Sequence, residues 1–261
     1  MKDKKIVPLS KKSKEIILGS LLGDGSLKIH RPYKNARFSF RHSIVQKEYF
    51  LWKVKSLREI AGKNSVFLQK NDHGFSKNPK LRFQSKALSE LSELYKLTHK
   101  RGKLKIRRKW LNTMSPLSLA IWWQDDGSIV ANGRKGVFCT DGFEKKSVKI
   151  IANYLKKVWG IKTNISPVEK KRGSKKEIYW RLYIRSTEEL KKFFRIILPY
   201  IYVPEMITKV AILYRDNQFQ QRWISEVAKL SGFSKTIINQ IIETKKRKWR
   251  KYSEKDIVQS L

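Results

Sequence analysis

The strongest constraint on the fold is that the chain repeats itself with a period of about 102 residues. Two mostly apolar segments, ILGSLLGDGS and LAIWWQDDGS, end in Asp-Gly-Ser, and their aspartates, Asp24 and Asp126, are 102 positions apart. Farther along, Ser85 in LRFQS and Ser186 in LYIRS keep nearly the same spacing. A repeat that extends over so many residues predicts two halves of similar structure.

Each repeat has the same predicted order of elements. In the first, residues 36–40 alternate like a half-buried strand, and residues 46–60 place apolar side chains at helical spacing. Two more strands and a helix from about residue 86 follow, and the second repeat retraces this order to about residue 198. The pattern predicts an α+β fold in which each half reads helix, strand, strand, helix, strand, strand, helix. The predicted boundaries are 1–110, 111–215 and, for a separate tail, 222–261.

The composition indicates a polyanionic partner. The chain has 59 Lys and Arg against 22 Asp and Glu, a net charge of +37. Hydrophobic residues make up 40% of it and aromatic residues 11%, which is enough for a folded core and excludes a disordered basic tail protein. The lone cysteine, Cys139, excludes an internal disulfide and a zinc finger. No apolar run approaches the ~18 residues of a spanning helix, so we expect no membrane partner and no export.

Residues 222–261 have no counterpart in either repeat. A short helix, a Ser-Gly-Phe turn and a second helix place Ala228, Gly232 and Ile238 where a helix-turn-helix needs a small contact, a left-handed turn and an apolar anchor. The basic run 245–251 suits phosphate contacts. The tail is therefore interpreted as a DNA-binding helix-turn-helix, with a capping pair of helices as the alternative.

The two Asp-Gly helix ends indicate a metal site. An aspartate at the carboxyl end of a helix faces the negative end of the helix dipole, so two of them require a compensating cation. If the two helices pack together at a pseudo-twofold axis, their carboxylates converge and repel each other unless divalent ions lie between them. Oxygen ligands favour Mg²⁺, with Mn²⁺ as an alternative. Such a site predicts metal-assisted phosphodiester hydrolysis.

The two segments resemble the defining motifs of the single-chain LAGLIDADG homing endonucleases. The motif residues are ILGSLLGDG at 17–25 and LAIWWQDDG at 119–127, and the resemblance extends over about residues 12–213. It implies two αββαββα units with saddle-shaped antiparallel sheets, and it implies that the eighth motif residues, Asp24 and Asp126, bind metal and act in catalysis.

The resemblance also implies roles for neighbouring residues. The carbonyls of Gly23 and Asp125, which precede the two aspartates, are implied to complete the metal sites. The second motif departs from the family pattern at Ile121 and Asp125, where small residues are usual. In the first motif, Gly19 and Gly23 are four residues apart on one helix face, which predicts close backbone approach.

The family further places a basic residue of each half beside the attacking water. By spacing, Lys103 and Lys209 are the best matches in the two halves, with Lys100 and Lys105 competing for the first position. A lysine there stabilises charge on the phosphate. Ser39 and Asp141 align weakly with polar positions near the cleavage centre. The histidines, including His42 and His73, show no ligand or triad spacing.

DNA recognition is assigned to strand residues on one face, because alternate residues of a strand point the same way. Arginine reads guanine and glutamine reads adenine in the major groove. The predicted contacts of the sheets and the tail are Lys28, His30, Arg37, Ser39, Arg41, Arg82, Gln84, Arg181, Tyr183, Arg185, Lys235, Thr236 and Asn239. The lysine runs 100–109 and 169–176 are interpreted as phosphate contacts or loops.

The leading hypothesis is a monomeric, site-specific, metal-dependent DNA endonuclease that cuts both strands. The resemblance implies a long asymmetric target and staggered cuts that leave short 3′ overhangs. The first alternative is an intron RNA maturase on the same fold, whose partner would be its own intron RNA. The second is a DNA-binding regulator that uses the helix-turn-helix, for which paired aspartates would be unnecessary.

Overall fold

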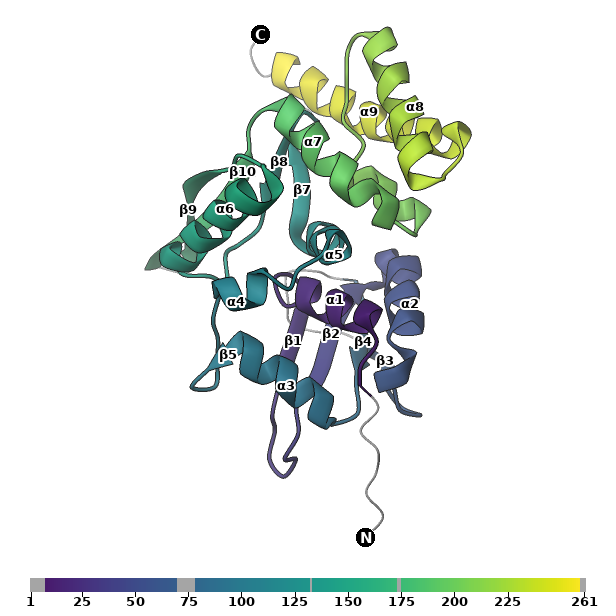
Figure 1. The fold of residues 1–261 in the computed structure, drawn as a ribbon. Helices are drawn as coiled ribbons and strands as arrows, with labels where there is room; N and C mark the ends of the chain where they lie inside the picture. Colours follow the sequence, from purple (N-terminus) through teal and green to yellow (C-terminus); the bar gives the residue numbers. More distant parts are fainter. Residues whose placement is uncertain (1–7, 70–77, 132, 173–174, 259–261) are drawn as a thin grey trace.

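The computed structural model describes residues 8–69, 78–131, 133–172 and 175–258 (Figure 1). His73 lies outside the described residues. Within these ranges the chain folds into two α+β units, one after the other, followed by a pair of helices. The predicted fold class and the predicted order of elements in both repeats are confirmed.

The first repeat forms a four-stranded antiparallel sheet in the order β1-β2-β4-β3. Its elements are α1 (Lys11–Ser20), β1 (Gly25–Lys28), β2 (Arg37–Ser43), α2 (Lys47–Ser56), β3 (Val66–Gln69), β4 (Lys80–Gln84) and α3 (Ser89–Thr98). The Ser10 hydroxyl caps α1 by accepting a hydrogen bond from the Ser13 N–H. Helices α2 and α3 pack against the strands and cover one face of the sheet.

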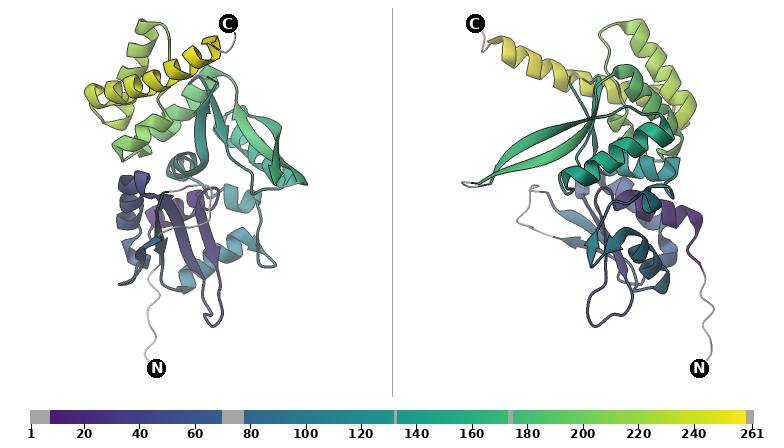
Figure 2. Two further views of the ribbon diagram at one scale, coloured as in Figure 1. Left: turned by 180° about the vertical axis from the view of Figure 1, so that it is seen from behind. Right: turned by 60° about the vertical axis from the view of Figure 1, so that its left-hand side comes forward.

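The second repeat forms an equivalent sheet in the order β7-β8-β10-β9. Its elements are α5 (Pro116–Asp126), β7 (Gly127–Val130), β8 (Lys135–Phe138), α6 (Lys145–Trp159), β9 (Asn164–Arg172), β10 (Lys175–Ile184) and α7 (Thr187–Ile197). Helices α6 and α7 cover one face, and the hairpin of β9 and β10 projects away from them (Figure 2). A hairpin of β5 (His99–Lys100) and β6 (Lys103–Leu104) and the short α4 (Arg108–Leu111) join the repeats, and the sequence did not predict these elements.

The amino-terminal helices of the two repeats, α1 and α5, pack against each other between the sheets (Figure 1). The approach is close: a Cβ added to Gly19 would lie 2.4 Å from the Ser118 carbonyl oxygen, and one added to Gly23 would lie 2.6 Å from the Cβ of Asp125. The glycines of the first motif therefore accommodate the larger Ile121 and Asp125 of the second. This packing brings the two Asp-Gly helix ends side by side.

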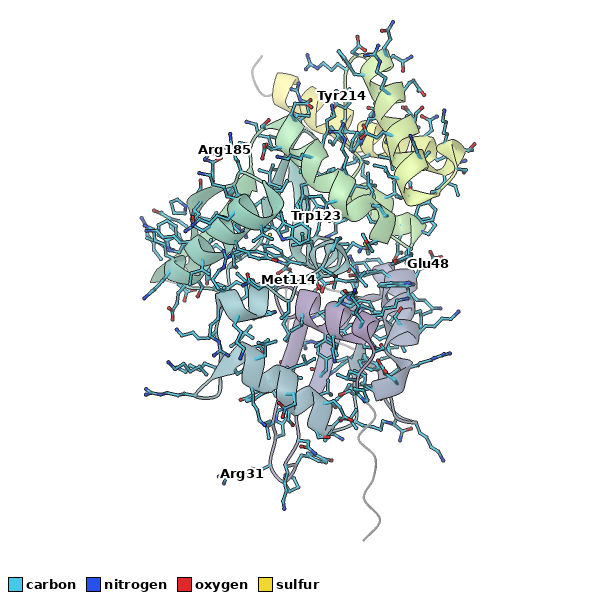
Figure 3. All side chains as sticks on the ribbon, in the orientation of Figure 1. Arg31, Glu48, Met114, Trp123, Arg185 and Tyr214 are labelled. Atoms are coloured by element: carbon cyan, nitrogen blue, oxygen red, sulfur yellow. The ribbon has the colours of Figure 1, made fainter. Side chains whose placement is uncertain are left out.

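The interior is rich in aromatic side chains. Trp122 stacks on Phe138 at 3.9 Å between ring centroids, and Trp123 meets Phe193 and Phe138 edge to face. Trp123 lies in the centre of the molecule (Figure 3). The Trp123 indole N–H donates to the Lys209 carbonyl at 2.9 Å, so the core also anchors a residue with a predicted catalytic role.

The tail consists of α8 (Asn217–Ser231) and α9 (Lys235–Val258), joined through Gly232 in the left-handed conformation at φ 78°. Buried side chains of both helices, such as Trp223 and Ile238, belong to the hydrophobic core. The carboxyl end of α9 lies on the same side of the molecule as the tip of the β9–β10 hairpin, and the α8–α9 turn lies on the opposite side (Figures 1 and 2). The predicted helix, turn and helix are thus present, and they are packed onto the second repeat.

Within the described ranges, no helix combines the length and the apolar character needed to cross a membrane.

Candidate active site between the motif helices

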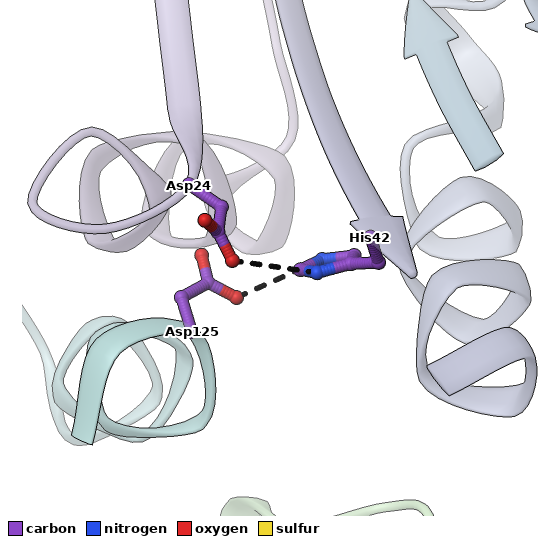
Figure 4. A group of neighbouring side chains, drawn as sticks. All are labelled: Asp24, His42 and Asp125. Carbon is purple, nitrogen blue, oxygen red and sulfur yellow. Dashed lines mark ion pairs between the residues drawn. The ribbon is translucent and has the colours of Figure 1, made fainter. Parts of the chain in front are cut away.

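The ends of the two motif helices meet strand β2 and helix α2 in a cluster of charged side chains. Asp24 follows α1, and Asp125 lies in the last turn of α5. Between them stands His42, whose Nδ1 lies 3.4 Å from Asp24 Oδ2 and whose Nε2 lies 3.8 Å from Asp125 Oδ1 (Figure 4). Potential ligand atoms of these three residues all lie within 4.8 Å of one another. The repeat packing thus brings the two motifs into one site.

Asp125 is held by side chains of α2. Lys53 Nζ lies 3.1 Å from both carboxylate oxygens of Asp125 and 3.4 Å from His42 Nε2, and the Tyr49 hydroxyl donates to Asp125 Oδ1 at 2.8 Å. The side chains of Lys53 and Asp125 are fully buried. A buried ion pair of this kind requires good geometry and further hydrogen bonds, and this pair has both.

Asp126 and Lys209 form the second-repeat side of the site. Lys209 lies in a 3-10 segment, Pro204–Lys209, and its ammonium donates to the carbonyl oxygens of Gly127 at 2.9 Å and Asp125 at 3.4 Å. These bonds cap the carboxyl end of α5 with a positive charge. Burial lowers the pKa of Lys209, while the nearby carboxylates of Asp125, Asp24 and Asp126 act in the other direction. The predicted Lys209 therefore lies at the end of α5, near the carboxylates of both motifs.

The two motif aspartates have opposite pKa shifts. Burial raises the pKa of Asp126 to about 8, and the negative charges of Asp24 and Asp125 add to the effect against the charge of Lys209. Burial alone would also raise the pKa of Asp24, but contact with His42 and the charges of Lys53 and Lys209 lower it. The cluster therefore contains enough cationic groups for Asp24 and too few for Asp126.

The carboxylates of the cluster differ in how far cationic side chains compensate them. Lys53 already occupies the space between Asp125 and His42, so the Asp125 carboxylate is neutralised without an ion. The Asp24 side chain is 40% exposed and lines the open face of the first sheet, and Asp126 is half-buried. Carboxylate oxygens are ligands that Mg²⁺ prefers, and the Asp24 carboxylate is the more open of the two motif carboxylates, whereas the Asp125 side chain is held inside the cluster by Lys53.

The open face of the first sheet forms a depression of about 250 Å³ beside Asp24. Cross-strand register places Ser39 opposite Gln84 and Arg41 opposite Arg82. The residues that line the depression include every predicted contact of the first sheet: Lys28, His30, Arg37, Ser39, Arg41, Arg82 and Gln84. The alternation in the sequence therefore identified side chains that share one surface with the motif aspartate.

On the second sheet, the predicted contacts are organised around a carboxylate. Arg181 donates two hydrogen bonds of 2.6 Å to Asp141, and Lys170 donates to the same side chain at 2.7 Å. These contacts, with the Arg181 bonds contributing most, lower the pKa of Asp141. Tyr183 lies on β10 two residues after Arg181, and Arg185 follows and donates to Ser166 at 2.9 Å. Asp141 thus holds the Arg181 guanidinium in a fixed orientation.

Comparison with known proteins identifies the family. The model of the LAGLIDADG DNA endonuclease family matches residues 14–193. The chain belongs to the LAGLIDADG DNA endonuclease family. It is a single chain that carries both LAGLIDADG-type repeats, so the resemblance read from the two Asp-Gly segments is confirmed.

The chain is also similar to individual proteins. The structure of the homing endonuclease I-WcaI bound to its DNA recognition sequence superposes with a TM-score of 0.67 at 25% identity, covering 81% of this chain and 91% of that one. The cytochrome b mRNA maturase bI2 of Debaryomyces hansenii is 29% identical over 78% of this chain and 75% of its own length. The RecA protein of Mycobacterium gastri is 29% identical over 74% of this chain. The chain spans 46% of the length of that RecA protein.

The predicted catalytic lysine of the first repeat and the predicted DNA contacts of the tail lie away from the LAGLIDADG helix ends. Lys103 is exposed in the β5–β6 hairpin, where it pairs with Lys100, and the lysine that contacts the motif cluster from the first repeat is Lys53 instead. The predicted tail contacts are exposed at the start of α9, next to the α8–α9 turn. This turn lies on the side of the molecule opposite the β9–β10 hairpin (Figure 2). These contacts are Lys235, Thr236 and Asn239.

Sequence reasoning missed three residues of the LAGLIDADG site: His42, Lys53 and Tyr49. The statement that His42 has no ligand spacing is corrected by its place between the motif carboxylates. A signal was available, because Phe38, Phe40 and His42 alternate on the buried face of β2. Tyr49 and Lys53 are likewise four residues apart on the buried face of α2, and a lysine at such a position requires a buried partner.

Proposed function

We propose that this chain is a site-specific homing endonuclease that makes metal-dependent double-strand breaks in DNA at a long asymmetric target. The observation that carries the proposal is the packing of α1 on α5, which leaves Asp24 and an electrostatically uncompensated Asp126 at adjacent helix ends. Beside them opens a surface lined by basic and polar strand residues. The net charge of +37 favours a nucleic acid partner.

In this proposal each motif aspartate serves the cleavage of one strand. Asp24 and Asp126 would hold Mg²⁺ or Mn²⁺, with the carbonyls of Gly23 and Asp125 as further oxygen donors. When bound, such ions would supply positive charge for attack of water on the phosphorus and for the leaving 3′ oxygen. Lys209, fixed by its bonds to α5, contributes positive charge to the phosphate of the strand cut in the second-repeat site. Lys103 remains the predicted equivalent for the first repeat.

Recognition in this proposal uses the open faces of both sheets. The arginines and Gln84 that line the first-sheet depression have the donors needed to read purine edges in the major groove. Arg181, held by Asp141, presents its remaining donors from the second sheet. The tail adds phosphate contacts. The part of α9 that follows Lys245 extends toward the side of the β9–β10 hairpin, and it is better placed for phosphate contacts than the helix-turn-helix contacts at the start of α9.

The test is selection followed by cleavage. The full chain would be used to select duplexes from a randomised library without Mg²⁺, and the selected duplex would then be incubated with Mg²⁺ or with EDTA. We expect a double-strand cut with short 3′ overhangs in Mg²⁺ and no cut in EDTA. Selection of a duplex that Mg²⁺ does not cause to be cut would favour the DNA-binding regulator and would reject the nuclease.

A second candidate function is that of an intron RNA maturase. The similarity to the Debaryomyces hansenii maturase, over three quarters of that protein, favours it. Its substrate would be the intron RNA that surrounds its own coding sequence, and its test is stimulation of splicing of that RNA. Splicing stimulated equally by wild type and by an Asp24→Asn, Asp126→Asn double variant, without any DNA cleavage, would support the maturase and reject the nuclease.

A further inference from the structure

A continuous line of polar contacts joins the two LAGLIDADG motifs through the first repeat. It runs from the carboxylate of Asp125 to Lys53 Nζ at 3.1 Å, from Lys53 to His42 Nε2 at 3.4 Å, and from His42 Nδ1 to Asp24 Oδ2 at 3.4 Å. His42 and Lys53 are polar side chains buried beside Phe40 and Phe50, and burial of polar groups at such a place is costly unless they are paired. The contacts therefore call for an explanation beyond packing.

The chemistry of lysine fixes the direction of these contacts. An ammonium group only donates hydrogen bonds, so His42 Nε2 accepts from Lys53. In a neutral imidazole the hydrogen then resides on Nδ1, the atom that faces Asp24. Lys53 thus acts in two ways: it anchors the end of α5 through Asp125, and it sets the tautomer with which His42 faces Asp24.

The second repeat has no equivalent of this arrangement among its described residues. Gly25 pairs with Phe40 and Gly127 pairs with Phe138, so the residue that corresponds to His42 is Thr140. Helix α2 begins seven residues after Phe40, and α6 begins seven after Phe138. Lys53 therefore corresponds to Ile151, a fully buried apolar residue. Both positioning groups come from the first repeat.

We propose that His42 and Lys53 are positioning residues that orient the two cleavage centres separately, with His42 acting on Asp24 and Lys53 acting, through Asp125, on the helix end that carries Asp126. The proposal rests on the proposed nuclease function. It predicts that disturbing the two residues affects opposite strands of the target, which a loss of overall stability would not do.

The role of His42 is tested with two amide substitutions that differ only in the length of the side chain. In His42→Asn the amide nitrogen replaces Nδ1 and retains a donor toward Asp24, whereas in His42→Gln it lies farther out, in the place of Nε2. We expect His42→Asn to cleave both strands within about threefold of wild type, and His42→Gln to slow one strand about tenfold or more, because small displacements of catalytic groups have effects of this size. The two variants carry the same functional group, so similar stability is expected.

The role of Lys53 is tested with a double variant in which both members of the Lys53–Asp125 ion pair are replaced by neutral side chains. Lys53→Met alone leaves the Asp125 charge buried without its partner and risks unfolding, so it is combined with Asp125→Asn, which retains the contact with Tyr49. We expect the double variant to fold, to bind the selected duplex within about threefold of wild type without Mg²⁺, and to slow cleavage of the strand opposite to the one affected by His42→Gln about tenfold.

The readout is the cleavage rate of each strand of the selected duplex, labelled with a different fluorophore on each strand, together with duplex affinity and urea unfolding. The proposal is supported if His42→Gln and the double variant slow cleavage of opposite strands. Equal slowing of both strands, slowing of the same strand in both variants, or slow cleavage by His42→Asn as well as by His42→Gln would overturn it. A wild-type protein that binds the duplex and never cuts it would instead reject the proposed function.

Discussion

At the scale of single residues, equivalent positions in a repeat acquire different chemistry from their surroundings. Asp24 and Asp126 occupy the same motif position, yet His42, Lys53 and Lys209 lower the pKa of Asp24, whereas burial and neighbouring carboxylates raise the pKa of Asp126 to about 8. Burial raises both pKa values, and the difference follows from the groups that oppose it: His42, Lys53 and Lys209 act on Asp24, whereas Lys209 acts on Asp126 against two neighbouring carboxylates. The site is therefore electrostatically asymmetric even though the fold repeats.

The opposite shifts predict opposite effects of charge removal on the metal-free protein. A carboxyl whose pKa is raised on folding destabilises the fold increasingly as pH rises from the unfolded value to the folded value. Asp126→Asn should therefore stabilise the metal-free protein by about 2 kcal/mol at pH 9, after allowance for solvent screening of the half-buried group, and have little effect near pH 4. Urea unfolding in EDTA at both pH values measures this.

Asp24→Asn is the matched control, because a lowered carboxyl pKa contributes stability above the unfolded value that is lost as pH falls. This variant should destabilise the metal-free protein at neutral pH and approach wild type in acid. Equal effects of the two substitutions, or effects independent of pH, would contradict the electrostatic description of the site.

The sequence identifies the motif residues of this site but misses those that hold them. Asp24, Asp126 and Lys209 are readable from local motifs and spacing, and the structure brings Lys209 to the end of α5. His42 and Lys53 reach the cluster through tertiary packing of β2 and α2, and their partner Asp125 is more than 70 positions from Lys53 in the chain. Only the packed fold shows that these residues meet. Lys103 illustrates the converse, since spacing alone favoured a lysine that lies exposed in the β5–β6 hairpin.

At the scale of elements, the order of strands and helices could be predicted because the sequence contains it twice, once in each repeat. Alternation in β2 and helical periodicity in α2 and α6 follow from burial of one face, so these predictions were correct. The short β5–β6 hairpin and α4 were missed because two-residue strands and a single helical turn carry too little periodic pattern. Tail docking was missed because it depends on contacts with the second repeat.

The close contact of α1 with α5 predicts that even a methyl side chain at Gly19 lowers the stability of the fold. Gly19→Ala places a Cβ 2.4 Å from the Ser118 carbonyl oxygen, so one helix must move. We expect a net loss of about 2 kcal/mol in the free energy of unfolding, because overpacking outweighs the gain in helix propensity. Gly142→Ala, with no atom within 4 Å of the new Cβ, is the control and should be near neutral. Equal unfolding midpoints for the two variants would contradict the observed helix packing.

The docking of α9 predicts an effect of the tail on catalysis. Lys245 donates to the carbonyl oxygens of Thr208 and Ala211 at 2.9 Å each, on either side of Lys209, and burial lowers its pKa to about 8. Lys245→Met should therefore slow cleavage about tenfold while duplex affinity changes less than about threefold. Lys248→Met, from the same hollow beside Glu205, is the control: it leaves the bonds to Thr208 and Ala211 intact, so the bound duplex should be cleaved at the wild-type rate even if affinity falls. Loss of affinity with an unchanged cleavage rate would make Lys245 a DNA contact instead.

At the scale of the whole molecule, the fold combines a basic, open sheet surface with an acidic centre. The net charge of +37 favours binding to DNA of any sequence, and the salt dependence of binding should be steep. Three of the acidic residues have partners within the chain: Asp24 contacts His42, Asp125 pairs with Lys53 and Asp141 pairs with Arg181. In the proposed function, Asp126 would take an external cation.

The central claim is that Asp24 and Asp126 serve cleavage and not binding. The most direct measurement compares wild type with Asp24→Asn and Asp126→Asn on the selected duplex, recording affinity without Mg²⁺ and double-strand cleavage with it. The account predicts affinities within about threefold of wild type and cleavage reduced about a hundredfold or more in each variant. Cleavage by either variant at the wild-type rate, or loss of affinity in a folded variant, would contradict it.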